Sequence, residues 1–539
     1  MNQAGWWRGA VVYQVYPRSF YDSNQDGIGD LQGIIQKLPY IADLGVDAIW
    51  ISPFFKSPMK DYGYDISDYR QVDPIFGRVE DVHQLIYAAH KLGLKVLMDM
   101  VLCHTSDQHP WFMQSRQDTS NDKSDWYVWV DAKEDGTPPN NWLSIFGGSA
   151  WEWDSNREQY YLHHFLKSQP SLNFHNPSVR AQMLAETEYW LKLGVDGFRF
   201  DAINFCFHDA LLTSNPAKQK HHRKGRGFSK DNPYAYQYHY YDNTRPENIA
   251  FIEELRELLN QYPGSVALGE ISAEDSIETM SEYTYSNKRL HLAYNFELLT
   301  DEFNAQYLAK VVSNVDKNIT GGWPCWAIGN HDVVRVRNRW GGKDANILHS
   351  KLYHSILFAL RGSVCLYQGD ELALPEADIE YLDLCDPYGI RFWPRFKGRD
   401  GCRTPIPWNE NQYAGFSEIK PWLPLAESHL PLAVSIQQQD AESMLNYCKR
   451  LLQWRKKQEA LLEGQMTHLA ANESILSFVR KSANQSILCI FNLTEQKSDF
   501  QLPVKAKLNE KNSFSLGLYL QQGRQLKLSA MSALFIELM

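Results

Sequence analysis

The sequence contains no run of about 18 consecutive apolar residues, the length that a membrane-spanning helix requires. Its eight cysteines are scattered without a CxxC pair, which excludes a disulfide framework and a zinc site of the usual spacing. A net charge of −10, with acidic and basic residues mixed along the chain, leaves no basic stripe for nucleic acid or an anionic membrane. The chain also lacks internal repeats and low-complexity tracts. These absences favour a globular protein whose partner is neutral.

The amino-terminal residues lack a basic segment followed by an apolar stretch and a small-residue cleavage site. We therefore expect a cytoplasmic protein with reduced cysteines, without nucleic-acid or membrane partners. A chain of 539 residues is too long for one ordinary core, so we expect a large central domain with smaller ones attached. Aromatic residues make up 13% of the chain; core packing explains most of them, but the composition leans toward a sugar partner.

Eight short apolar runs, bounded by polar residues, Gly or Pro, are typical of buried strands. They are Ala10–Tyr16, Asp47–Ser52, Lys95–Leu102, Val195–Asp201, Val266–Ile271, His291–Phe296, Trp326–Asn330 and Ser363–Tyr367. Helical stretches lie between most of them, including Leu31–Leu44, Val79–Leu92, Val179–Leu193, Asn248–Gln261 and Ile347–Leu360. Repetition of strand and helix predicts an α/β fold, a TIM (β/α)8 barrel.

Two long stretches, one after strand 3 and one after strand 8, interrupt the predicted barrel. The stretch between Leu102 and Val195 is rich in Asp, Asn, Ser, Trp and Gly, which predicts a small domain inserted after strand 3. After a helix over Tyr447–Leu461, alternating or apolar segments of strand length predict a C-terminal antiparallel β domain. The expected limits are 1–103 and 171–460 for the barrel, with a subdomain at about 371–441 after strand 8, 104–170 for the insertion, and 461–539 for the C-terminal domain.

Three acidic residues fall where predicted strands end. Asp201 ends strand 4, Glu270 ends strand 5, and Asp332 follows strand 7 in the segment IGNHD. The carboxyl ends of barrel strands converge on one face, so these carboxylates should meet there. Arg199 lies two residues before Asp201 and therefore faces the same side; its charge should keep Asp201 ionised. His104 and His331 would add hydrogen-bond donors at the same face.

A single aspartate at a strand end is more often a helix cap or a turn former than a catalyst. Three carboxylates on one face, with two histidines and an arginine, are harder to explain that way. Glycoside hydrolysis needs this inventory: one carboxyl group protonates the leaving oxygen, and another attacks the anomeric carbon or activates water. The pattern leaves the separation of the carboxylates open, and with it the choice between a retaining and an inverting mechanism.

Several ordered segments carry a resemblance to a known family. They are YQVYPRSFYDSNQDGIGDLQGI, DYGYDISDYR, DMVLCHTSDQHPWF, QPSLNFHNP, GFRFDA, the GE of residues 269–270, GNHD and GRDGCRTPIPW. With them the sequence resembles, over essentially its whole length, the α-amylase superfamily of glycoside hydrolases (family 13), in its bacterial α-glucosidase and oligo-1,6-glucosidase branch. The resemblance implies a retaining mechanism. Asp201 would form the covalent glucosyl intermediate, Glu270 would act as general acid/base, and Asp332 would hold sugar hydroxyls.

The resemblance also implies a subsite for the terminal glucose of a small-molecule α-glucoside, and no cofactor for catalysis. Its expected residues are Asp61, Tyr64, His104, Arg199, Ala202, His331 and Arg399, with Phe146 and Phe165 walling the entrance. The chain departs from its relatives at Cys103, where Asn is common, at Ser171, and at Asp370, where Glu is common. The Cys103 departure argues against an amylase-type calcium site. We expect a monomer or homodimer.

A separate metal site is suggested by the loop DSNQDGIGD. Oxygen-bearing residues at alternate positions, with Gly in the turn, suit a hard cation, and the spacing partly imitates an EF-hand loop. A metal-free Asp/Asn turn is the common alternative. The resemblance favours a structural Ca2+ or Mg2+ ion, with Ile28 contributing its carbonyl. The full expected ligand set is Asp22, Asn24, Asp26, Ile28 and Asp30.

The residue after the nucleophile bears on the bond that is cleaved. In the branch that the sequence resembles, Val at this position accompanies α-1,6 activity, and Ala or Thr accompanies α-1,4 activity. Ala202 therefore predicts a preference for α-1,4-linked substrates such as maltose, with sucrose and transglucosylation as further activities. The resemblance implies an exo-acting enzyme. The alternatives are an oligo-1,6-glucosidase or dextran glucosidase, a sucrose isomerase or trehalose-forming transglucosidase, and, remotely, a non-catalytic relative.

Overall fold

The computed structural model describes residues 5–223, 231–502 and 506–539. Its centre is a sheet of eight parallel strands in the order β11-β10-β9-β5-β2-β1-β13-β12. The strands are β1 (Val11–Val15), β2 (Ala48–Ile51), β5 (Lys95–Val101), β9 (Gly197–Asp201), β10 (Val266–Ile271), β11 (Leu292–Asn295), β12 (Cys325–Ala327) and β13 (Ser363–Tyr367). A parallel bridge between Ala293 and Pro324 joins β11 to β12 and closes the sheet into the expected (β/α)8 barrel.

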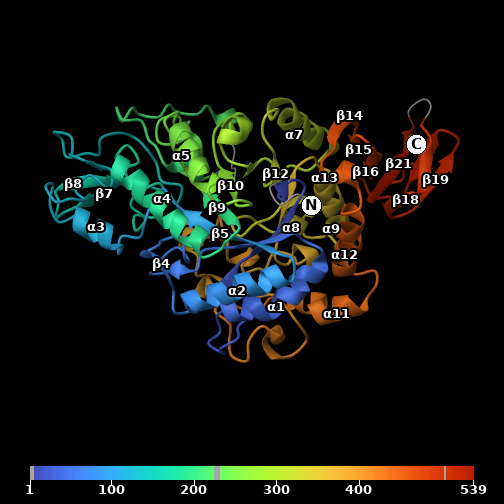
Figure 1. The fold of residues 1–539 in the computed structure, drawn as a ribbon, viewed down its shortest axis with the longest axis horizontal. Helices are drawn as coiled ribbons and strands as arrows, with labels where there is room; N and C mark the ends of the chain where they lie inside the picture. Colours follow the sequence, from blue (N-terminus) through green and yellow to red (C-terminus); the bar gives the residue numbers. More distant parts are fainter. Residues whose placement is uncertain (1–4, 224–230, 503–505) are drawn as a thin grey trace.

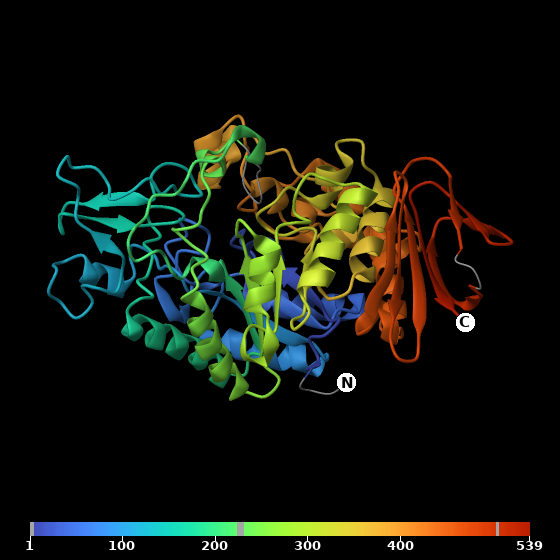
Figure 2. The same ribbon diagram turned by 90° about the horizontal axis from the view of Figure 1, so that it is seen from above.

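Helices surround the barrel (Figures 1 and 2). Their bounds are α1 (Leu31–Leu44), α2 (Val79–Lys91), α4 (Pro177–Lys192), α5 (Asn248–Asn260), α6 (Ser276–Tyr283), α7 (Ala305–Asn318), α8 (Val336–Gly341), α9 (Ile347–Ala359) and α12 (Met444–Arg455). Local sequence sets their ends: in α1 the Asp30 carboxylate caps the first turn at the Gly33 amide, and Gly45 ends the helix at φ 87°. Shorter helices are α3 (Pro110–Ser115), α10 (Pro387–Phe392), α11 (Val434–Gln439) and α13 (Glu459–Leu462).

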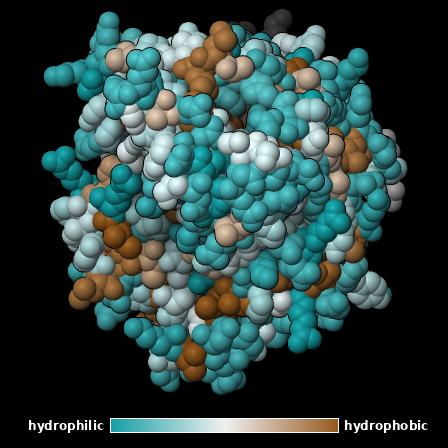
Figure 3. All heavy atoms as spheres, turned by 90° about the vertical axis from the view of Figure 1, so that its left-hand side faces the viewer, coloured by the Kyte–Doolittle hydropathy of each residue, from teal (hydrophilic) through white to brown (hydrophobic). Residues whose placement is uncertain are grey.

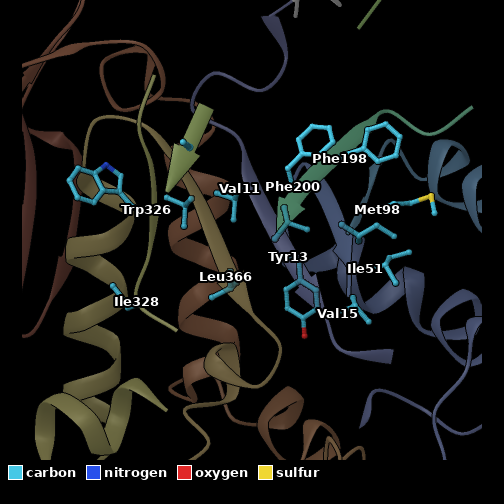
Figure 4. Packing of buried hydrophobic residues seen from close by; sticks show 14 of the residues in the cluster. Val11, Tyr13, Val15, Ile51, Met98, Phe198, Phe200, Trp326, Ile328 and Leu366 are labelled. Carbon is cyan, nitrogen blue, oxygen red and sulfur yellow. The ribbon is translucent and has the colours of Figure 1, made fainter. Parts of the chain in front are cut away.

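Alternate residues of the barrel strands face opposite sides. Val11, Tyr13 and Val15 belong to the large cluster between strands and helices, as do Phe198 and Phe200 of β9 (Figure 4). The intervening positions fill the barrel interior, where Val12, Trp50, Leu97, Leu268 and Leu292 share a second cluster. The inward positions near the carboxyl ends are polar instead. This switch from apolar to charged side chains creates the site.

Two of the predicted elements differ from the observed ones in ways that bear on the site and on the domain that follows the barrel. The seventh strand is Cys325–Ala327, not Trp326–Asn330, because Ile328 and the residues after it leave the hydrogen-bonded ladder although they are buried. Asp332 therefore lies in a loop five residues beyond the strand. The helix predicted over Tyr447–Leu461 begins earlier, at Met444, and is broken after Arg455, with α13 following.

The stretch after β5 carries a small antiparallel sheet, with β8 (Gln159–Leu162) between β6 (Trp129–Val130) and β7 (Trp151–Asp154). Earlier in the chain, between β2 and α2, β3 (Phe55–Lys56) and β4 (Asp68–Val72) form a two-stranded sheet. The side of the molecule that holds β7, β8 and α3 is mostly hydrophilic, with hydrophobic residues in separate small groups (Figure 3). The small domain inserted after strand 3 is thus confirmed.

The C-terminal part forms two antiparallel sheets at the opposite end of the molecule from β7 and β8 (Figure 2). The larger has the order β14-β15-β16-β21-β18 and the smaller β17-β20-β19. Their bounds are β14 (Gln465–Ala471), β15 (Ile475–Lys481), β16 (Ser486–Asn492), β17 (Ser498–Gln501), β18 (Leu508–Leu516), β19 (Tyr519–Gln522), β20 (Gln525–Leu528) and β21 (Ser532–Leu538). Buried Arg480 ties the larger sheet to the barrel through the carbonyls of Ala359 and Leu360.

All eight cysteines lie in the described part of the chain and are free thiols. Among the described residues, no helix combines the length and the apolar character that a bilayer crossing would require.

Candidate active site

Strand register brings Asp201 and Glu270 to the same height. Asp201 ends β9, and Glu270 follows Gly269, the Cα partner of Phe200 on the neighbouring strand. Both acids occupy inward positions at the carboxyl end of the barrel, and both are more than nine-tenths buried. The convergence expected from barrel topology is therefore observed for this pair.

One guanidinium connects the two acids. Arg199 Nη1 lies 2.6 Å from Asp201 Oδ1, and its Nη2 lies 2.6 Å from Glu270 Oε1. The same Nη1 also lies 2.8 Å from Oδ1 of Asp99 on β5. Arg199 is fully buried, so a single permanent cation faces three carboxyl groups in a medium with little water.

Burial dominates the protonation of this group. It raises the pKa of Glu270 to about 7 and also raises the pKa of Asp201, while Arg199 lowers both and the neighbouring carboxylates raise them. The charge of Arg199 acts in the expected direction, since it favours ionised Asp201, but its effect on the pKa is smaller than that of burial. Two such acids favour one shared proton near neutral pH, with one group ionised and the other protonated.

Asp332 differs from this pair because two arginines reach it. Arg399 Nη1 lies 3.1 Å and Arg403 Nη2 lies 2.9 Å from Asp332 Oδ1. Although burial opposes it, these charges and His331 hold the pKa of Asp332 well below its usual range. Asp332 is therefore a permanent anion, suited to accepting hydrogen bonds from hydroxyl groups.

An inner pocket with a volume of about 90 Å³ lies against these acids. Ten of the twelve predicted catalytic and substrate residues line it: Asp61, Tyr64, His104, Phe146, Phe165, Asp201, Ala202, Glu270, Asp332 and Arg399. Ion pairs close its wall, since Arg399 Nη2 lies 2.8 Å from Asp61 Oδ1. Phe146 and Phe165 lie with ring centroids 6.0 Å apart, which agrees with their expected place in the wall.

The other two predicted residues lie behind the pocket wall. Arg199 acts on the site through its ion pairs. His331 is held from behind by Gln14, whose Nε2 lies 2.8 Å from His331 Nδ1, and its ring stacks at 5.2 Å on Tyr64. Its Nε2 is buried without a hydrogen-bond partner and lies 3.5 Å from Asp332 Oδ2. The predicted contacts of these two residues with the substrate remain predictions.

Several residues of the site were not predicted from the sequence. Asp99 and Tyr294 are inward-facing polar residues within apolar strands, a signal that could have identified them. Gln169 bridges Asp61 Oδ2 at 3.0 Å and His104 Nε2 at 3.2 Å. It begins the segment QPSLNFHNP that supports the family resemblance, a signal that could have identified it. The remaining unpredicted lining residues are Ile145, Phe205, Ser272, Phe296 and Tyr388.

A second, outer cavity of about 1150 Å³ adjoins the inner pocket, and Asp332 lines both. Among residues 5–223 and 231–502, eight Asp and Glu and four Lys and Arg side chains line it. Some of these acids are paired: Lys218 Nζ lies 2.6 Å from Glu274 Oε1, and Asp332 contacts Arg399 and Arg403.

The predicted metal loop is folded around its own backbone amides. Asp22 Oδ1 accepts from Gln25 N at 2.7 Å, and Asp26 Oδ1 accepts from Ile28 N at 2.8 Å. Asp30 is engaged as the cap of α1. Over residues 5–223, 231–502 and 506–539, no three His, Cys, Asp or Glu side chains come together in a way that could hold a metal ion.

Comparison with known proteins identifies relatives of this arrangement. A family model described as the catalytic domain of α-amylase matches residues 14–464. The chain is 53% identical over 503 residues to a probable α-glucosidase of Rhizobium meliloti strain 1021, covering 93% of this chain and 91% of that protein. It is 36% identical to the oligo-1,6-glucosidase of Heyndrickxia coagulans, covering 92% and 94%. A solved α-glucosyl transfer enzyme, XgtA, superposes with a TM-score of 0.97 at 56% identity, covering 99% of this chain and 100% of that one.

Proposed function

The chain belongs to the α-amylase family, and from that premise we propose that it is a retaining, exo-acting α-glucosidase that releases glucose from short α-1,4-glucosides such as maltose. The observation that carries the proposal is the pairing of Asp201 and Glu270 on the two ends of one guanidinium. Two carboxyl groups at one anomeric centre, one ionised and one protonated, are what glycoside cleavage requires.

In this mechanism Asp201 attacks the anomeric carbon while Glu270 gives its proton to the leaving oxygen. A glucosyl ester on Asp201 forms, and Glu270 is left as a carboxylate. Water then attacks the ester, Glu270 takes a proton from that water, and the Asp201 carboxylate is regenerated. Because both carboxyl groups contact the same guanidinium, they lie close together, which favours the retaining geometry over the wider spacing that an inverting enzyme needs for its water.

The size and closure of the inner pocket support exo action. Asp61 and Arg399 pair at its wall, and the rings of Phe146 and Tyr388 lie 5.2 Å apart beside them. Because this wall leaves no room for further sugar units, the glucose bound beside Asp201 would be the non-reducing end of the substrate. Asp332, a permanent anion, would hold its hydroxyls, and Tyr64 would offer its ring to the sugar face.

Ala202 supports the α-1,4 preference through its position. It lines the pocket directly after Asp201, and its backbone is left-handed at φ 42°. A larger, β-branched side chain there would both fill the pocket and strain the backbone. A side-chain difference of this size discriminates between substrates by about 1–3 kcal/mol.

A substrate panel tests this proposal. Purified protein is given maltose, isomaltose, sucrose, trehalose and starch, and the products are identified. We expect free glucose, with kcat/KM for maltose above that for isomaltose and starch a poor substrate. A strong isomaltose preference would instead identify an oligo-1,6-glucosidase, and rearranged sucrose without free glucose would identify an isomerase.

Transglucosylation is a second activity that the outer cavity supports. Its volume of about 1150 Å³ leaves room for an acceptor beside the inner pocket. An acceptor hydroxyl there could replace water in the second step, with Glu270 taking its proton. At high maltose concentration the expected products are therefore glucose together with longer oligosaccharides.

We also propose that the loop of Asp22, Asn24, Asp26, Ile28 and Asp30 holds a structural Ca2+ or Mg2+ ion. The donor chemistry suits a hard cation, since all side-chain donors are oxygens. Burial raises the pKa of Asp30, and the charge of neighbouring Asp22 adds to this rise. A cation would compensate these buried acids. Its contribution would be to the stability of the loop before α1 and not to catalysis.

A further inference from the structure

Tyr294 stands beside the proposed general acid/base. It lies on β11, where it is the Cα partner of Glu270 across the strand pair. Its hydroxyl donates to Glu270 Oε1 at 2.8 Å and accepts from Arg199 Nη2 at 3.0 Å and Nε at 3.3 Å. Tyr294 is fully buried and does not line the inner pocket. It can therefore act on the substrate only through the residues that it contacts, Glu270 and Arg199.

The two carboxyl oxygens of Glu270 have different surroundings. Oε1 faces two donors, the Tyr294 hydroxyl at 2.8 Å and Arg199 Nη2 at 2.6 Å. Oε2 has one weaker contact, the Ala202 amide at 3.2 Å. Arginine cannot accept a proton, and the lone pairs of the Tyr294 hydroxyl face Arg199. A proton on Oε1 would therefore point at a hydrogen-bond donor, which is unfavourable. A proton on Oε2 can instead be donated to the leaving oxygen.

We propose that Tyr294 is a positioning residue for the acid/base: its hydroxyl, held by Arg199, fixes Glu270 with Oε1 inward and the proton on Oε2. The inference rests on the proposed glucosidase function. When Oε2 transfers its proton to the leaving oxygen, Glu270 becomes a carboxylate and the Tyr294 bond to Oε1 becomes charge-assisted and stronger. When the attacking water returns a proton to Oε2, the bond weakens again. Tyr294 thus favours proton donation in the first step.

Other titratable groups face Glu270 as well, and they remain when Tyr294 is altered. They are Arg199 and Asp201 of β9, Asp99 of β5, Asp332 of the loop after β12, and the neutral thiol of Cys103. Among these influences the Tyr294 hydrogen bond lowers the pKa of Glu270, whereas burial raises it. Removing only the hydroxyl should therefore raise the pH at which Glu270 loses its proton.

Tyr294→Phe in the full chain tests this role, and Tyr447→Phe is the control. Tyr447 lies on helix α12 and is also buried, and its replacement removes a hydroxyl contact of 2.6 Å to Ser355. In Tyr294→Phe the basic limb of kcat/KM for maltose should move up by about one pH unit. The loss of kcat/KM should be large for maltose and small for α-glucosyl fluoride, whose fluoride leaves with little help from an acid. Tyr447→Phe should change neither.

Replacing Tyr294 by 3-fluorotyrosine gives a second test that preserves the packing. The hydroxyl stays and becomes a stronger donor, so the basic limb should move to lower pH. The role of Tyr294 would be overturned if the basic limb of the pH profile stayed in place in both variants. It would also be overturned if Tyr294→Phe lost equal kcat/KM for maltose and for α-glucosyl fluoride. Failure of the wild-type protein to hydrolyse any α-glucoside would instead overturn the proposed function, so the two failures are distinguishable.

Discussion

Single residues set the protonation on which the chemistry depends. Glu270 must be protonated to assist the leaving group, and burial raises its pKa to about 7. Because an acid with a raised pKa keeps its proton up to that pKa, activity should be lost as pH rises through it.

We accordingly predict that kcat/KM for maltose declines above about pH 7, following the pKa raised by burial of Glu270. Glu270→Gln removes the titrating group, so the residual activity of this variant should show no such basic limb. The measurement is the pH profile of both proteins with maltose as substrate. A basic limb that persists in Glu270→Gln would assign the titration to another group.

Ala202 carries the linkage preference in this account. We predict that Ala202→Val lowers the ratio of kcat/KM for maltose to that for isomaltose by about tenfold or more. It should also lower the unfolding temperature, because the backbone at φ 42° disfavours a β-branched residue. Ala202→Gly, which fits that backbone without strain, should keep the maltose preference. An unchanged ratio in Ala202→Val would remove Ala202 from the account of linkage.

At the scale of elements, prediction from sequence worked where burial was uniform. β10 and β13 have the predicted limits, because parallel strands covered on both faces give unbroken apolar runs. The prediction failed at β12, because the apolar run continues into a buried loop that forms no strand-to-strand hydrogen bonds. Short elements such as α3 and α8 were also missed, since six residues are too few to show helical periodicity.

The loop before α1 yields a prediction at the same scale. The wild-type protein should retain one equivalent of calcium or magnesium after dialysis, measured by inductively coupled plasma mass spectrometry, and chelation should lower its unfolding temperature. Asp26→Asn should lose the ion while keeping activity at moderate temperature. The control is Asp118→Asn, which alters another exposed aspartate that accepts amide hydrogen bonds, here from Ser120 and Asn121. Equal metal content in both variants and the wild type would contradict the site.

At the scale of the whole molecule, the family resemblance predicted more of the site residues than the local sequence pattern did. Barrel topology alone placed Asp201 and Glu270 together, and the resemblance indicated ten residues that line one pocket. Neither assigned a role to Gln169 or Tyr294, and neither predicted the outer cavity, because these depend on loops and strand register that bring distant residues together. The predicted domain limits at 104, 171 and 461 remain predictions.

The central claim is that Asp201 carries the glucosyl group during turnover. The most direct test is trapping with 5-fluoro-α-glucosyl fluoride, followed by peptide mass spectrometry. Its ring fluorine slows both steps, and its good leaving group keeps the first step fast enough for the covalent intermediate to accumulate. The account predicts one fluoroglucosyl group on the peptide that contains Asp201, and none in Asp201→Asn, whose turnover should fall by about 10⁴-fold or more. An adduct on another carboxylate, or no adduct during demonstrated turnover, would contradict it.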